Sequence, residues 1–277
     1  MSAGHPAAAP ARLIVEVRGG RAAGTQAVIE PGATLRFGRT DLADVPITHD
    51  DQLSSVHFEL TWDGRSCQLQ DRGSVKGTAV GGLPVLRAEV PHGGWIRAGR
   101  TDFIVHVEGR IPPLEGEDDP PDDAARSALA ALRAAARREP LHAVIDAARS
   151  DNLLPLLRAS VERHRSLYDG VEGEALAHVA PYLVGPMRED SPLLDMLVLR
   201  GWHRRWGVYL TSRAPFDEVR RVLRRVLMVE LEATGEKVYF RFYDPWVLSR
   251  LWPVATAQQR DALTGSGALT FVEHVRP

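Results

Sequence analysis

Short β-rich runs separated by glycine, proline and aspartate occupy the stretch from Leu13 to Val107, and they constrain the fold more than any other feature of the chain. The runs start roughly 8 to 12 residues apart, as strands do in β-sandwiches. Apolar residues alternate at Val56, Phe58 and Leu60, which is the period of a strand with one buried face. The pattern predicts an all-β sandwich over residues 12–109.

Length and charge bound the remaining possibilities. The chain has 277 residues, of which 44% are apolar, and a formal net charge of -2. It is long enough for two modest cores and has no overall attraction to nucleic acid or anionic lipid. Its one cysteine, Cys67, cannot form an intramolecular disulfide. With no export signal and no long uncharged apolar run, we expect a cytoplasmic protein without a membrane span.

The composition changes at residues 110–139. The stretch GRIPPLEGEDDPPDDAAR is rich in proline and acidic residues and lacks apolar periodicity, which predicts a disordered linker. An alanine-rich segment follows, with Asp122 or Asp123 as a candidate N-cap and Leu129 and Leu132 three residues apart. This segment predicts a short helix that packs weakly on the next domain.

Residues 140–277 alternate strand-like and helical runs, which predicts a second domain of the α/β or α+β class. Ser191-Pro192 indicates the start of a helix that ends at Gly201, and Asp244-Pro245 repeats the start signal. A further helix is predicted from apolar residues at helical spacing, namely Phe216, Val219, Val222, Leu223, Val226 and Leu227.

Three motifs follow one another in the N-terminal region: FGRT, LSSVHFEL and DRGSVKGTAVGG. Their order, spacing and β-rich context resemble the forkhead-associated (FHA) domain, a sandwich that recognises phosphothreonine. The resemblance implies that Arg39 and Ser54 contact the phosphate, that His57 supports the loops from within, and that Gly38 permits a close turn. The chemistry agrees, because a guanidinium can fork onto two phosphate oxygens while a hydroxyl donates to a third.

Two positions depart from the family pattern. Lys76 and Gly81 stand where the family usually has asparagine, and a lysine has no carbonyl to accept a bond from a bound peptide backbone. Lys76 instead offers a second cation beside Arg39. Phosphothreonine binding, a phosphate-independent protein contact and a structural remnant therefore stay open. The candidate binding residues are Arg39, Ser54, Ser55, Lys76 and Thr78, with Thr40 and Val75 also on the rim, and with Gly38, His57 and Gly77 in support.

Aromatic-rich segments mark the second domain, among them VAPYLV, SPLLDMLVLRGWHRRWGVYLTS, FDEVRRVLRRVL and VYFRFYDPWVLSRLWP. Together with the RSLYDG turn, they resemble the domain of type VI secretion effector adaptors, or chaperones. The resemblance implies a cytoplasmic protein that binds a toxic effector and helps to load it onto the VgrG spike protein. It transfers no catalytic residue.

Candidate partner contacts in this domain are aromatic or basic. Trp246, directly after a helix start, is the preferred exposed tryptophan, whereas core packing is the default for the others. The run RRVLRR, with Arg220 and Arg224, falls opposite the apolar stripe, so a solvated face and a patch for an acidic partner are both open. No aromatic interleaving or recognition helix accompanies it, and no nucleic-acid partner is expected.

Catalytic signals are missing from the sequence. It contains no nucleophile elbow, Walker loop or dinucleotide-binding glycine motif. We therefore expect no enzyme, no cofactor and no metal site. The scattered histidines are expected to be satisfied structural residues, and three aspartates to cap helices or form turns. These residues are His142, His164, His178 and His203, and Asp146, Asp169 and Asp244.

The two resemblances together predict a non-enzymatic adaptor. Its C-terminal domain would hold an effector, while the FHA-like domain recruits a second, phosphothreonine-containing partner. The alternative is a phosphorylation-responsive signalling scaffold without effector-chaperone activity.

Overall fold

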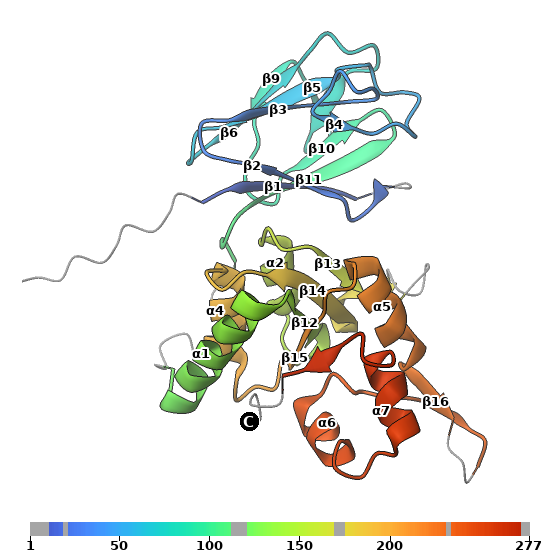
Figure 1. Ribbon diagram of the computed structural model, residues 1–277. Helices are drawn as coiled ribbons and strands as arrows, with labels where there is room; N and C mark the ends of the chain where they lie inside the picture. Colours follow the sequence, from blue (N-terminus) through green and yellow to red (C-terminus); the bar gives the residue numbers. More distant parts are fainter. Residues whose placement is uncertain (1–10, 19–21, 112–120, 169–174, 231–233, 273–277) are drawn as a thin grey trace, which may run out of the picture. The chain divides into compact units, whose positions relative to one another are not determined.

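The computed structural model describes residues 11–18, 22–111, 121–168, 175–230 and 234–272. The chain divides into two compact units, Met1–Arg110 with Arg158–Val161, and Ile111–Leu157 with Glu162–Pro277 (Figure 1). Most of the predicted linker, residues 112–120, lies outside the described residues, as do Asp169 and the end of the RSLYDG turn.

The first unit contains two β-sheets. One has the strand order β2-β1-β11-β10-β7-β8 and the other β4-β3-β5-β6-β9. Neighbouring strands are antiparallel except for β3 and β4, and the predicted β-sandwich is confirmed. The strands are β1 (Leu13–Val17), β2 (Gln26–Ile29), β3 (Thr34–Gly38), β4 (Val45–Pro46), β5 (Phe58–Trp62), β6 (Cys67–Asp71), β7 (Thr78–Val80), β8 (Leu83–Val85), β9 (Arg87–Glu89), β10 (Trp95–Ala98) and β11 (Thr101–Val107).

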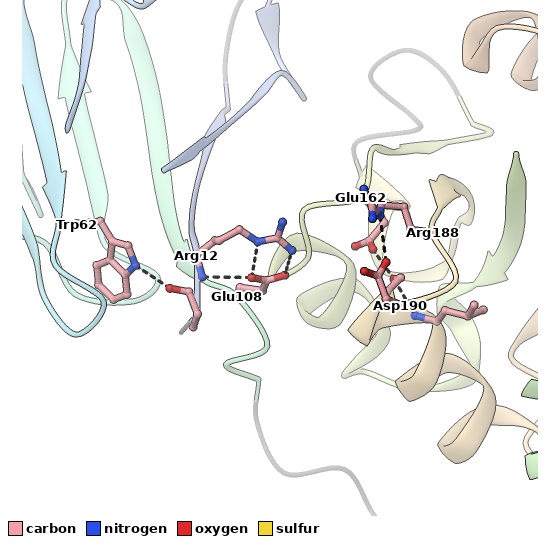
Figure 2. Close-up of polar contacts among 9 residues, drawn as sticks. Arg12, Trp62, Glu108, Glu162, Arg188 and Asp190 are labelled. Carbon is pink, nitrogen blue, oxygen red and sulfur yellow. Dashed lines mark hydrogen bonds and ion pairs between the residues drawn. The ribbon is translucent and has the colours of Figure 1, made fainter. Parts of the chain in front are cut away.

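Aromatic rings fill the centre of this unit. Phe37 and Phe58 stack with ring centroids 4.9 Å apart, and Phe103 meets both rings edge-on. Trp62 is also buried, and its indole N–H donates to the carbonyl of Ala11 at 2.7 Å, as Figure 2 shows. Because these groups come from both sheets, the ring cluster joins the two layers.

The second unit is built on one antiparallel sheet with the strand order β13-β14-β12-β15-β18. A separate two-stranded ribbon, β16-β17, accompanies it. Because adjacent strands run antiparallel, the domain belongs to the α+β side of the predicted class. The strands are β12 (Leu141–Asp146), β13 (His164–Ser166), β14 (Pro181–Met187), β15 (Gly207–Thr211), β16 (Met228–Glu230), β17 (Lys237–Tyr239) and β18 (Thr270–Phe271).

Hydrophobic clusters lie on both faces of this sheet. The central strand β12 shows the division, because Ile145 packs into one cluster and its neighbour Val144 into the other. Helices α1, α2 and α4 contribute to the first cluster, and α5 and α7 to the second (Figure 1). The helices are α1 (Asp123–Arg138), α2 (Leu153–Arg158), α4 (Pro192–Gly201), α5 (Phe216–Arg225), α6 (Pro245–Leu251) and α7 (Ala257–Thr264), with 3₁₀ turns η2 (Ala147–Arg149) and η3 (Ala177–Val179).

The helix signals read from the sequence are confirmed. Ser191 accepts a bond from the Leu194 amide at 3.1 Å, and α4 ends at Gly201 as predicted. Asp244 accepts from the Trp246 amide at 2.9 Å at the start of α6. Figure 2 shows Glu162 near the start of α4, where its carboxylate accepts from the Ser191 hydroxyl. Within the described ranges, no helix combines the length and apolarity needed to cross a bilayer.

Helix α1 differs from its prediction. Asp122 is its N-cap, as one of the two candidates, but the helix runs for 16 residues and is not weakly packed. Leu129 and Leu132 are buried in the same cluster as α4. The alanines on this face, such as Ala128, let the helix approach closely, because they add little volume and lose no side-chain entropy on burial.

His142, on β12, is not the satisfied histidine that the sequence analysis expected. Its side chain is buried, and neither ring nitrogen has a hydrogen-bond partner among the described residues. The ring instead lies 6.2 Å from that of Phe216. Desolvation by burial lowers the pKa of His142 to about 4. The neutral imidazole therefore acts as an apolar group within the second cluster.

His142 makes the second unit sensitive to acid. Because its pKa is lower in the folded chain, the unfolded chain binds more protons below pH 6.5, and stability falls as the pH drops towards 4. Relative to His142→Phe, the wild-type chain should lose about 2 kcal/mol of unfolding free energy between pH 7 and pH 5. Urea denaturation followed by tryptophan fluorescence at both values measures this difference. Equal losses in the two proteins would contradict the assignment.

Candidate phosphopeptide-binding site and partner surfaces

Three loops lie at the same end of the first unit. They connect strands β3, β4, β5 and β6, which are neighbours in one sheet, and strand β7, which belongs to the sheet on the other side of the core. The β3–β4 loop begins at Arg39, the β4–β5 loop carries Ser54 and Ser55, and the β6–β7 loop carries Lys76 and Gly77. The structure therefore brings together residues that the sequence separates by more than 30 positions.

Hydrogen bonds join these loops directly. The Arg39 amide donates to the Ser54 carbonyl at 2.9 Å, and Arg39 Nε donates to the Leu53 carbonyl at 3.2 Å. The Val75 amide donates to Ser54 Oγ at 3.1 Å. Since Ser54 Oγ accepts this bond, its own proton remains available to an incoming anion. The Nε bond orients the exposed Arg39 guanidinium while leaving its terminal N–H groups for other acceptors.

His57 holds two of the loops together from inside. Its side chain is fully buried, with Nδ1 3.1 Å from the Ser54 amide and Nε2 3.1 Å from the Gly77 carbonyl. The amide can only donate, so Nδ1 accepts, and Nε2 carries the proton that the Gly77 carbonyl accepts. The neutral tautomer is thus set by its neighbours. The supporting role implied for His57 by the family resemblance matches this geometry.

Asp71 anchors the third loop, although it lies outside the candidate binding residues predicted from the sequence. Its carboxylate accepts from the Ser74 amide at 2.8 Å, from the Ser74 hydroxyl at 2.6 Å and from Thr78 Oγ1 at 2.6 Å. Burial raises the pKa of Asp71, but these hydrogen bonds outweigh it and the net pKa is lowered. The aspartate three residues before a serine was the available signal, typical of a side-chain-closed turn.

Gly38 is required by close packing of backbone. A Cβ atom built there would lie 2.2 Å from the Ser55 carbonyl oxygen, well inside van der Waals contact. The strand β3 and the β4–β5 loop can approach only because no side chain separates them. Gly77 meets a different need, since its φ of +75° lies in the left-handed region that other residues avoid.

The remaining predicted rim residues fall into two groups. Lys76 and Val75 are exposed, and Val75 presents 86% of its surface to solvent. Ser55 and Thr40 are partly buried, and Thr40 Oγ1 donates to the Ser55 carbonyl at 3.4 Å. Thr78, in contrast, is buried with its hydroxyl on Asp71, so its prediction as a binding residue is wrong. It supports the loop instead of facing a ligand.

The candidate partner-binding residues of the second unit differ in how far they are buried. Trp246 is 50% exposed, in agreement with its choice as the preferred exposed tryptophan. The Arg250 guanidinium lies 5.2 Å from its ring centroid. Arg220 is only 7% exposed, and its Nε donates to the Ser166 carbonyl at 2.8 Å. The placement of Arg220 on a solvated face is therefore wrong. Arg224 is half-buried and donates to the Leu167 carbonyl at 3.0 Å.

An ion network around two buried aspartates in this unit was not anticipated. Asp146 and Asp244 cap η2 and α6 as expected, but they also bind arginines. Arg241 pairs with Asp146, and Arg149 pairs with both aspartates. These four residues join segments almost 100 positions apart, which no local pattern could indicate. Two buried carboxylates balanced by two guanidinium groups are typical of structural networks.

Reactive groups are scarce in the described part of the chain. The thiol of Cys67 is buried, and burial raises its pKa to about 12, so the thiolate form is disfavoured at neutral pH. The described residues contain no group of three or more histidine, cysteine or acidic side chains arranged to hold a metal ion.

Replacing His57 tests whether the loops depend on it. His57→Ala should lower the unfolding free energy of the first unit by about 3 kcal/mol, because two bonds and a filled volume are lost. His49→Ala, at an exposed histidine in the same loop, is the matched control and should change it by less than about 0.5 kcal/mol. Thermal unfolding of the full chain measures both. A His57→Ala protein as stable as the control would show that the bridge is dispensable.

Comparison with known families supports both halves of this description. The family model for the FHA domain matches residues 35–99, which include all three loops. The model described as a domain of unknown function, DUF4123, matches residues 141–262, which include four of the five strands of the main sheet of the second unit, all but β18.

Individual relatives match the first unit. The FHA domain-containing protein FhaA of Mycobacterium tuberculosis is 36% identical over 58 residues, which are 21% of this chain and 11% of that protein. The chain thus spans about a tenth of this curated relative. A structure described as an analysis of phosphothreonine-dependent FHA domain interactions is 27% identical, with a TM-score of 0.32, covering 37% of this chain and 99% of the other.

The FHA domain of the Chlamydia trachomatis protein CT664 is 21% identical, with a TM-score of 0.33, covering 34% of this chain and 96% of the other. The two family models show that the chain carries an FHA domain followed by a DUF4123 domain, and the recognition of both families from the sequence is confirmed.

Proposed function

We propose that the protein is a non-enzymatic adaptor of type VI secretion. Its DUF4123 domain binds a toxic effector in the cytoplasm and helps to load it onto the VgrG spike, while its FHA domain recruits a second partner through phosphothreonine. The observation that carries the proposal is the convergence of Arg39 and Ser54 in the FHA domain of a chain whose other domain matches DUF4123.

The geometry of the three loops supports phosphate recognition. The Arg39 guanidinium is held at one N–H and offers others, and the Ser54 hydroxyl has a proton to donate. These are the donors that suit a phosphate dianion, and charge-assisted bonds of this kind are stronger than neutral ones. Lys76 lies next to Val75 and Gly77, both tied to the same site, and adds positive charge. Its substitution for the usual asparagine favours recognition of the phosphate over the peptide backbone.

The adaptor role of the second domain is supported by the DUF4123 match and by the resemblance of its aromatic-rich segments to effector adaptors. Both families are interaction domains. Trp246 offers an exposed aromatic anchor of the kind that dominates protein interfaces. A chain with two interaction domains raises the local concentration of one partner near the other.

Arg39→Ala should weaken binding of a phosphothreonine peptide library by about tenfold to a hundredfold, because a charge-assisted contact is worth about 1.5 to 3 kcal/mol. Arg65→Ala is the matched control, since Arg65 lies in the β5–β6 turn at the opposite end of the sandwich, and it should leave binding unchanged. Arg39→Lys keeps the charge without the fork and should bind at an intermediate level. Isothermal titration with phosphorylated and unphosphorylated peptides measures these affinities.

Two results would contradict phosphate recognition. One is equal affinity for phosphorylated and unphosphorylated peptides, which would leave a phosphate-independent contact. The other is loss of binding in Arg65→Ala to the same extent as in Arg39→Ala, which would indicate a general effect of charge.

The effector role predicts a specific complex. A toxin encoded beside this gene should co-purify with the full chain, and deleting the gene should abolish its secretion. Phosphatase treatment should release the FHA partner but leave the effector bound, because the two sites lie in different domains. Normal secretion of the toxin after deletion would overturn the adaptor role. Kinase-dependent partners without a bound toxin would favour the signalling scaffold instead.

A further inference from the structure

An open groove with a volume of about 450 Å³ lies on the surface of the second unit, between helix α5 and the edge strand β13. Among the described residues, guanidinium groups dominate its walls, against one carboxylate. The lining residues are Arg165 from β13 and Asp217, Arg220, Arg221, Arg224 and Arg225 from α5.

Part of this positive charge has a structural task. Arg220 and Arg224 donate to the carbonyls of Ser166 and Leu167, where β13 ends at the edge of the sheet. These bonds satisfy backbone acceptors that no further strand covers, and they stop another strand from pairing there. Asp217 is bound to Arg163 at 2.8 Å and lies 3.8 Å from Arg165, so its charge is also engaged.

Arg221 and Arg225 take no part in these structural contacts. Both are exposed, and within the described part of the chain neither has a hydrogen bond or ion pair. They are four positions apart on α5, a spacing at which like charges repel and destabilise the helix slightly. The fold therefore contains two neighbouring cations that no contact within the described residues explains.

An exposed apolar surface adjoins these cations. Helix α5 leads almost directly into the β16–β17 ribbon, where Met228 and Tyr239 are cross-strand partners. Met228 is 41% exposed and Tyr239 is 66% exposed. The Tyr239 ring lies 6.0 Å from that of Tyr168, whose carbonyl accepts from Arg220 in the groove. Arginine, tyrosine and methionine are the residue types enriched at the centres of protein interfaces.

We propose that this groove binds an acidic segment of the effector, with carboxylates on Arg221 and Arg225 and an apolar residue against Met228 and Tyr239. The inference rests on the proposed adaptor function and adds the chemistry of the contact. Charge complementarity requires an anionic partner, and the exposed Met228 and Tyr239 beside the arginines favour a carboxylate-bearing peptide over nucleic acid. The chain as a whole has a net charge of -2, so it has no overall attraction to a nucleic-acid backbone.

The test uses the full chain, the co-purifying toxin, and a fluorescent peptide of ten glutamates as a defined probe. The variant Arg221→Glu/Arg225→Glu should weaken binding of both the toxin and the peptide by at least about tenfold. The control Arg138→Glu/Arg260→Glu changes charge equally, with one arginine in the last turn of α1 and the other within α7, and should bind as wild type. Arg221→Lys/Arg225→Lys should retain most affinity, and circular dichroism checks the fold of every variant.

The remaining arms separate the possible failures. Tyr239→Ala should weaken toxin binding but not binding of the glutamate peptide, because only the toxin brings an apolar residue. Toxin binding unaffected by Arg221→Glu/Arg225→Glu would overturn the groove and leave the adaptor function intact. If no toxin binds even the wild-type chain, the adaptor function fails, and the glutamate peptide still decides whether the groove takes carboxylates. Tighter binding of a twenty-nucleotide oligothymidine than of the peptide would overturn the proposal in favour of nucleic acid.

Discussion

The requirement that buried polar groups find partners organises both domains of this protein. In the FHA domain, His57 has no access to water and can be satisfied only by the Ser54 amide and the Gly77 carbonyl, which forces two loops together. Asp71 acts in the same way on the third loop. The positions of Arg39 and Ser54, which would meet a ligand, follow from these interior bonds. An exposed site is thus held by contacts that never touch the ligand.

The DUF4123 domain follows the same rule, with a few exceptions among the described residues that include His142 and the indole N–H of Trp206. Asp146 and Asp244 are buried because Arg241 and Arg149 neutralise them, and this network fixes the start of α6, next to the exposed Trp246. His142 has no hydrogen-bond partner among the described residues and stays neutral, because a neutral imidazole costs less free energy to bury in the apolar cluster than a charged one. An acid-sensitive core and a network of ion pairs can therefore exist in the same domain.

The arginines of helix α5 show how burial distinguishes side chains that stabilise the fold from side chains that can bind a partner. All four lie in one short run of the sequence, and the composition of that run does not distinguish them. Two are committed to the carbonyls at the end of β13, whereas Arg221 and Arg225 make no hydrogen bond to any residue that the structure describes. In an adaptor, such uncommitted cations beside exposed aromatic side chains are suited to a partner whose charge and apolar residues complement them. The FHA site and the groove would then recognise different chemistries, phosphate and carboxylate, in separate domains.

Much of this organisation was determined by the sequence alone. Period-two alternation gave the β-sandwich, motif spacing placed Arg39, Ser54 and His57 in one domain, and Ser191-Pro192 and Asp244-Pro245 marked helix starts, because each signal is local and backbone geometry enforces it. Only the tertiary structure decided that Thr78 and Arg220 face inward, that α1 belongs to the core, and that Asp146 meets Arg241. These outcomes depend on which elements pack together. The contacts of Arg220, of α1 and of Asp146 join residues about 50 to 100 positions apart, which carry no local pattern that records them.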